Sequence, residues 1–90
     1  MEHETLSAKV FDSGEALRAH RQQVHLSQMK LAKRANVQAW KIIRFELGEL
    51  DADRFTDPER ERIAAALQAE VNRLRNFTFG ETVAAGVDAA

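Results

Sequence analysis

The chain has 90 residues, of which 44% are hydrophobic, and a formal net charge of -1, so one small domain with a modest core is expected. It has no cysteine, which excludes disulfides and thiolate metal sites. No stretch approaches the roughly 18 apolar residues of a membrane span, and the acidic N-terminus lacks the basic and apolar regions of a signal peptide, so we expect a cytoplasmic protein with no membrane partner.

The charges are distributed unevenly. The net charge alone argues against a nucleic-acid partner, but no Asp or Glu occurs between Ala16 and Phe45, and all fourteen acids lie outside that window. The window contains seven cations: Arg18, Arg21, Lys30, Lys33, Arg34, Lys41 and Arg44. A polyanion responds to local charge, because salt screens its field within about 8 Å. A solvated helix face is the alternative, but the absence of acids across the window favours a basic surface.

The first elements are an arm and a helix. Residues 1–12 are expected to form an N-terminal arm, in which residues 5–11 have the β-branched and aromatic content of a short edge strand. Disorder is the competing expectation for the first four residues. Asp12 or Ser13 then opens a helix through Gln23, because Asp12 and Glu15 have capping-box spacing. Leu17 is expected to face the core.

Two short helices follow, joined by a tight turn. Ser27 is the N-cap candidate for a helix over residues 28–35. Asn36 ends it, since asparagine tolerates the left-handed conformation that a tight turn needs. Residues 38–46 form the second helix, with Ile42 and Phe45 facing inward, and Gly48 supplies its stop.

A longer helix completes the pattern. Residues 49–55 are acidic and predict a loop or a single turn. Thr56, Pro58 and Glu59 then predict a helix start. The helix is expected to reach about Arg75, with an apolar stripe formed by Ile63, Leu67, Val71 and Leu74. It is longer than a three-helix core needs, so its far end is expected to reach a partner subunit. Residues 76–79 alternate polar and aromatic, a weak strand signal, and residues 80–90 are small and apolar.

The segment from Gln28 to Leu47 meets the requirements of a helix-turn-helix. Ala32 is small where the helices touch, Asn36 lies at the turn, and neither helix contains proline. Residues 17–67 resemble the lambda-repressor-like, or Xre-type, family. The matching residues are Leu17 to Arg21, Leu26 to Gln28, Leu31, Ala32, Val37, Ile42, Glu46, Gly48 and Ile63 to Leu67. The resemblance implies an all-α, compact bundle of four to five short helices, with short strands at the termini left open. The chain departs from the family in having Asn36 instead of glycine and a longer, acidic link after Gly48.

The resemblance also implies site residues. Base contacts are expected from Gln38, Ala39, Trp40 and Arg44, and phosphate contacts from Arg21, Ser27, Gln28, Lys30 and Lys41. Arg44 suits a guanine or a phosphate, and Gln38 suits an adenine. Trp40 either meets a thymine methyl group or is buried in the core or in a protein interface. Glu46 is expected to brace Arg21 or the helix end.

The expected function is a homodimeric transcriptional repressor or autoregulator on a palindromic DNA operator. Residues 13–75 would bind DNA, and residues 76–90 would be a tail that helps dimerisation. The expected dimer surface comprises Val71, Leu74, Phe77 and Phe79. The alternative is an antitoxin whose tail neutralises a toxin, and a third reading is a helix-turn-helix fold that no longer binds DNA. No metal-ligand spacing, phosphate loop or nucleophile elbow occurs, so neither a cofactor nor an enzyme is expected.

Overall fold

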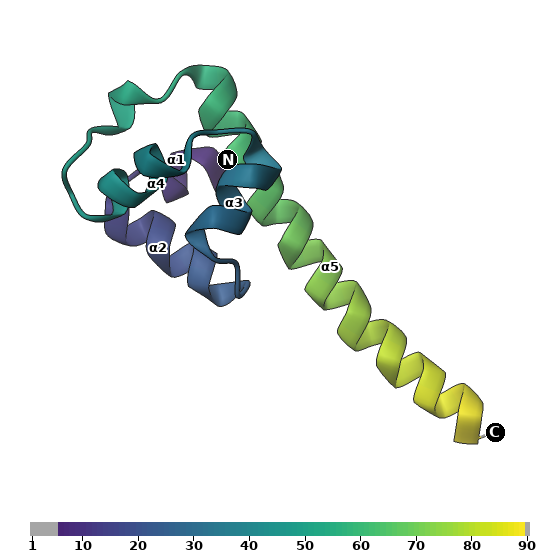
Figure 1. The fold of residues 1–90 in the computed structure, drawn as a ribbon. Coiled ribbons are helices and arrows are strands. Elements are labelled where there is room, and N and C mark those ends of the chain that lie inside the picture. Colours follow the sequence, from purple (N-terminus) through teal and green to yellow (C-terminus); the bar gives the residue numbers. More distant parts are fainter. Residues whose placement is uncertain (1–5, 90) are drawn as a thin grey trace, which may run out of the picture.

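The computed structural model describes the backbone of residues 6–89 and the side chains of residues 8–76. This part of the chain is all-α and contains no strand. Its elements are α1 (Leu6–Val10), α2 (Gly14–Gln23), α3 (Gln28–Ala35), α4 (Ala39–Glu46), the short 3-10 helix η1 (Ala52–Arg54) and α5 (Asp57–Ala89). The first half of α5 packs against α1 and α3, and its second half extends away from the other helices (Figure 1).

Both strand expectations at the termini are wrong. Residues 6–10 form α1, and residues 76–79 lie within α5, which continues to Ala89 instead of ending near Arg75. Val10 is fully buried and Phe11 packs against the core, so these two residues of the expected arm contribute to the packed domain. Burial against the other helices outweighs the local preference of β-branched and aromatic residues for strands, which depends strongly on context.

The core draws on every α-helix and on the link before α5. Its fully buried side chains include Val10, Leu17, Leu31, Ile42 and Ile63. Phe11, Phe45 and Phe55 form an aromatic cluster whose ring centroids lie 5.1 to 5.5 Å apart. Phe55 follows η1 in the acidic segment expected to be a loop or a single turn, and it is only 1% exposed. Aromatic pairs contribute about 0.5–1.5 kcal/mol each beyond their buried area, so this cluster anchors the link after α4.

The helix starts follow the polar residues that precede them. Ser13, one of the two expected caps, begins α2, since its Oγ accepts a hydrogen bond from the Ala16 amide at 3.0 Å. Ser27 caps α3 in the same way. Thr56 and Glu59 form a reciprocal capping box, with bonds of 2.8 and 3.2 Å between each side chain and the other's amide. The expected starts of α3 and α5 are thereby confirmed.

Three successive helices, α2, α3 and α4, end in the same way. Each is followed by one residue in the left-handed conformation: His25 at φ 59°, Asn36 at φ 56° and Gly48 at φ 82°. The next amide then reaches back to a carbonyl five residues earlier, as in a Schellman motif. These bonds join Leu26 to Arg21, Val37 to Ala32, and Glu49 to Arg44. The prediction for Asn36 is confirmed, and both Leu26 and Val37 enter the core directly after the turn.

Gly14 marks a close approach between α2 and α4. A Cβ atom on Gly14 would lie 2.0 Å from the carbonyl oxygen of Phe45 and 2.9 Å from the Cα of Glu46. These neighbours are backbone atoms and cannot rotate away. The start of α2 therefore meets the end of α4 at a distance that only glycine permits.

Gly14→Ala should lower the free energy of unfolding by about 1–3 kcal/mol in a urea titration, because the added methyl group forces the two backbones apart. Gly48→Ala is the comparison, since nothing lies within 4 Å of its added Cβ. That variant should lose only the left-handed penalty of about 1–2 kcal/mol, without any shift of α2 against α4. A Gly14→Ala protein as stable as the parent would contradict the close approach.

Asn36→Gly should leave stability unchanged or raise it slightly, because glycine adopts a φ of 56° without steric cost. Thermal unfolding followed by circular dichroism measures the change. Lys33→Gly, in the interior of the same helix, should instead lose about 1 kcal/mol. Equal losses in the two variants would show that Asn36 needs its side chain.

Candidate nucleic-acid interface

Helix α4 has one face in the core and one in solvent. Ile42 and Phe45 are 0% and 4% exposed, as expected from their spacing. On the other side Gln38, Trp40 and Arg44 are exposed, and Ala39 is half-buried. Trp40 is 43% exposed, which excludes the alternative that it belongs to the core. Three of the four residues expected to contact bases, Gln38, Trp40 and Arg44, therefore lie at the outer surface of α4 and its N-terminus, whereas Ala39 packs against the edge of the core.

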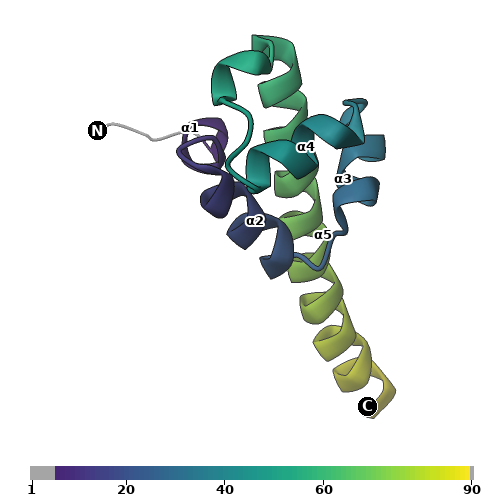
Figure 2. The same cartoon turned by 60° about the vertical axis from the view of Figure 1, so that its left-hand side comes forward.

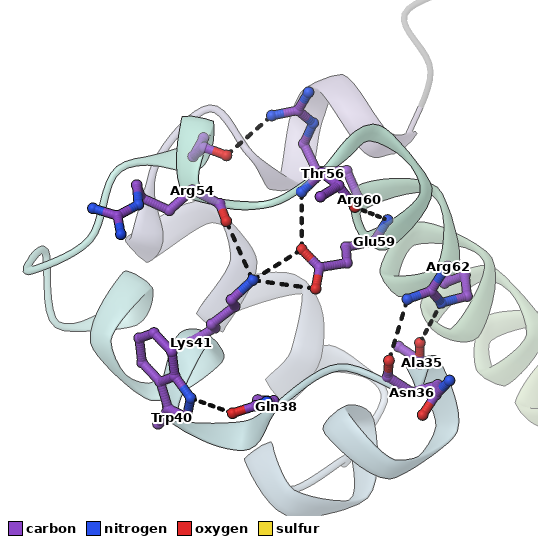
Figure 3. A network of polar contacts seen from close by, with 11 residues as sticks. Ala35, Asn36, Gln38, Trp40, Lys41, Arg54, Thr56, Glu59, Arg60 and Arg62 are labelled. Atoms are coloured by element: carbon purple, nitrogen blue, oxygen red, sulfur yellow. Dashed lines mark hydrogen bonds and ion pairs between the residues drawn. The ribbon is translucent and has the colours of Figure 1, made fainter.

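Three of these side chains also contact one another. The indole Nε1 of Trp40 donates a hydrogen bond to Oε1 of Gln38 (Figure 3). The guanidinium carbon of Arg44, four residues further along α4, lies 5.5 Å from the Trp40 ring centroid. We refer to Gln38, Trp40 and Arg44 as the Trp40 cluster. It forms a connected polar and aromatic surface on the outside of the molecule.

A buried carboxylate holds α4 from behind. The Glu46 side chain is 3% exposed. Its oxygens accept hydrogen bonds from Nε and Nη2 of Arg21, both at 2.8 Å, and from Nε2 of Gln28 at 3.0 Å. Arg21 also donates to the Leu26 carbonyl at 2.8 Å. The expectation that Glu46 braces Arg21 is confirmed, and the end of α4 is tied to both α2 and α3.

Helix α5 holds the other end of α4. Nζ of Lys41 donates to both carboxylate oxygens of Glu59 at 3.2 Å and to the Arg54 carbonyl at 3.3 Å (Figure 3). Arg62 donates to the carbonyls of Ala35 and Asn36 at 2.8 and 3.2 Å, at the turn between α3 and α4. Figure 2 shows α4 beside α3 and in front of α5. In this structure Lys41, which is expected to contact phosphate, connects α4 to η1 and to the start of α5.

The seven cations of the acid-free window divide into two groups. Three pair with acids from outside the window: Arg21 with Glu46, Arg34 with Glu70, and Lys41 with Glu59. The other four are exposed and form no ion pair with the residues whose side chains the structure describes: Arg18, Lys30, Lys33 and Arg44. The flanking acids therefore neutralise part of the basic segment, and its exposed cations keep their charge available to an anion.

An open depression of about 510 Å³ lies between α2, the start of α3 and α4. It is lined by Arg18, Arg21, Ser27, Gln28, Ile43, Glu46 and Leu47. The structure thus brings together three of the expected phosphate contacts, Arg21, Ser27 and Gln28. The backbone N–H of Lys30 donates a hydrogen bond to Oγ of Ser27, next to this group. Arg18 was not among the expected contacts. Its sequence signals were its place in the acid-free window and its position one helical turn before Arg21.

The expected dimer residues lie on α5. Val71 and Leu74 are half-buried and pack against the edge of the core. The backbones of Phe77 and Phe79 belong to α5, but their side chains lie outside the described residues. Within the described part of the chain, no three side chains form a metal site, and no helix is long and apolar enough to cross a membrane.

No family model, curated protein or solved structure matches the chain. The evidence on function is therefore the geometry of the exposed side of α4 and the charge of the cations around it.

A second buried carboxylate joins α3 to α5. The Glu70 side chain is 4% exposed and receives bonds from Arg34 and Arg73, with Nε of Arg73 at 2.8 Å. The hydrogen bonds from Arg73, and then those from Arg34, hold the pKa of the Glu70 carboxyl below its ordinary value and outweigh the opposing effect of burial. A carboxyl whose pKa is lowered by folding stabilises the fold while it is ionised.

Acid should therefore destabilise the protein through Glu70. The stabilisation is fully present above the ordinary pKa of 4.5 and is lost as the pH falls through the lower, folded value. Glu70→Gln should reduce this pH dependence in urea titrations made at successive pH values. Glu61→Gln, on the exposed side of the same helix, should retain it. An unchanged acid profile in Glu70→Gln would contradict the assignment.

Proposed function

We propose that this protein binds double-stranded DNA in a sequence-specific way and acts as a transcriptional repressor or autoregulator. One observation carries the proposal. Helix α4 is held on the core by Ile42 and Phe45, while its opposite face presents an amide, an indole and a guanidinium group. The major groove of DNA admits an α-helix, and these groups suit the edges of its bases.

The exposed cations supply contacts to the DNA backbone. Arg18 lies beside the depression, and Lys30 and Lys33 are exposed on α3. Ser27 and Gln28, at the start of α3, complete the set. Phosphate contacts fix orientation and base contacts fix specificity. Each of the three guanidinium nitrogens of Arg21 already donates a hydrogen bond within the protein, and Nζ of Lys41 is paired with Glu59. We therefore assign these two residues a positioning role behind the surface.

The order of elements supports a helix-turn-helix of the Xre type. In this arrangement α3 crosses the DNA backbone and α4 enters the groove as the recognition helix. The left-handed Asn36 allows the turn, and Ala32 and Ala35 are buried between the helices. The ties from Glu46, Glu59 and Arg62 hold α4 rigidly, as precise base contacts require.

We further propose that two copies bind a palindromic operator. A single module of this size buries only about 600–1,000 Å² on DNA, and a dimer places two recognition helices about 34 Å apart. The second half of α5 supports a partner. It extends away from the other helices (Figure 1), and most helical stability in proteins comes from packing against other elements, which this half lacks in the single chain. It also contains Gly80 and Gly86, which weaken it further.

A toxin bound by the same helix remains the alternative partner. The proposed location is the cytoplasm.

The test is binding to duplex DNA from upstream of the protein's own coding sequence. The single tryptophan, Trp40, lies in the surface, so its fluorescence should change on binding. Affinity should fall steeply with salt, because cations released from phosphates oppose binding. Arg44→Ala should lose about 1–3 kcal/mol at one base position. Lys30→Ala should weaken binding to every sequence and reduce the salt slope by about one.

Gln68→Ala is the control, because Gln68 is exposed on the first half of α5 and lies outside both the proposed DNA surface and the proposed partner surface. It should leave both affinity and specificity unchanged. Sedimentation of the complex should give two chains per operator. Absence of salt-dependent binding to any duplex at low salt would contradict the proposal and favour a fold that no longer binds DNA.

A further inference from the structure

We propose that Trp40 is a positioning residue for base recognition. It orients the amide of Gln38 so that the NH₂ group can donate to a base, and it orients the guanidinium of Arg44 for a two-bond contact to guanine. The inference rests on the proposed function and specifies what α4 reads. It differs from the sequence-based expectation, in which Gln38 pairs with adenine and Trp40 itself contacts a base. The Trp40 cluster carries the argument.

The first step concerns the amide of Gln38. Gln38 is the N-cap residue of α4, but its side chain forms no capping bond. Its Oε1 instead accepts from the indole of Trp40. An indole N–H can only donate, so the atom facing it must be the amide oxygen, and the orientation of the amide is decided. The NH₂ group of Gln38 is left to face a ligand.

This orientation changes which base Gln38 can recognise. The paired contact to adenine needs both amide atoms, since the oxygen accepts from N6 and the nitrogen donates to N7. With the oxygen held toward Trp40, Gln38 directs its NH₂ donors outward, and its oxygen would have to turn away from the indole to face adenine N6. Gln38 therefore suits acceptors in the major groove, such as guanine O6 and N7 or thymine O4. The Trp40 hydrogen bond thereby selects against adenine at this position.

The second step concerns the guanidinium of Arg44. It lies over the Trp40 ring at 5.5 Å and forms no ion pair with any described residue. A stacked guanidinium uses its face, so the N–H groups at its edge remain free. Its long side chain is restricted before DNA arrives, which reduces the entropy lost on binding. Arg44 is thus prepared for the two-bond contact to guanine O6 and N7.

The third step concerns Trp40 itself. The only polar atom of the indole ring is already used by Gln38, so Trp40 has no hydrogen bond to offer to a base. At 43% exposure the ring is accessible, but its contacts are to the two side chains that can read DNA. Trp40 therefore acts through Gln38 and Arg44.

Selection from a pool of randomised duplexes tests this inference with the full chain. Trp40→Phe keeps an aromatic ring beneath Arg44 but removes the N–H donor to Gln38. The guanine preference at the base that Arg44 contacts should persist, and the preference at the base that Gln38 contacts should shift toward adenine. Trp40→Leu removes both, and the guanine preference should fall about tenfold. Arg44→Lys keeps the positive charge but removes the planar pair of N–H donors. This variant should lose the guanine preference and retain salt-dependent binding.

A measurement on the free protein accompanies the selection. The indole N–H resonance should move in Gln38→Ala and stay in place in Gln68→Ala. If the wild type binds duplexes with a preference that Trp40→Leu leaves unchanged, the positioning role is wrong and the proposed function stands. A thymine preference that is lost in Trp40→Leu but retained in Gln38→Ala would likewise overturn the positioning role in favour of direct contact by Trp40. If the wild type binds no duplex, the proposed function fails and the inference fails with it.

Discussion

The buried carboxylate of Glu46 determines how α2, α3 and α4 fit together. Removing a carboxylate from water costs several kcal/mol unless charged and polar partners replace the lost hydration. Arg21 and Gln28 supply these partners from two different helices. Only an arrangement that brings all three side chains together avoids the cost, so the network specifies geometry more than it adds stability. The contact between Gly14 and the α4 backbone adjoins this network and allows the helices to approach closely enough to form it.

The same principle explains how a nearly neutral chain presents a basic surface. Glu46, Glu59 and Glu70 lie outside the acid-free window, and each pairs with one cation inside it. Those cations hold helices together, whereas the remaining cations of the window face solvent. Net charge averages over both groups and therefore conceals the difference. A polyanion would meet only the exposed group, because screening confines its attraction to nearby charges.

Helix α4 is consequently a rigid support for side chains that contact one another. Glu46 fixes one end of the helix, and Lys41 and Arg62 connect its other end and the preceding turn to α5. The Trp40 cluster extends this order outward, since its members restrict each other before any ligand binds. A surface organised in advance loses less entropy on binding than one built from free side chains. The first half of α5 thus supports the proposed site from behind, and its second half extends away from the other helices.

Local sequence signals were sufficient for α3, α4 and the start of α5, including the Ser27 cap, the left-handed Asn36 and the inward Ile42. These features depend on residues within one or two helical turns, so spacing alone predicts them. The sequence also identified the acid-free window and the exposure of Gln38 and Arg44, but it left the exposure of Trp40 open. Tertiary structure decided the helix in place of the expected N-terminal strand, the burial of Phe55 and the pairing of Lys41 with Glu59. Each of these depends on which distant segment packs alongside. A cation's spacing along the chain does not reveal whether its nearest neighbour in the fold is an acid or solvent.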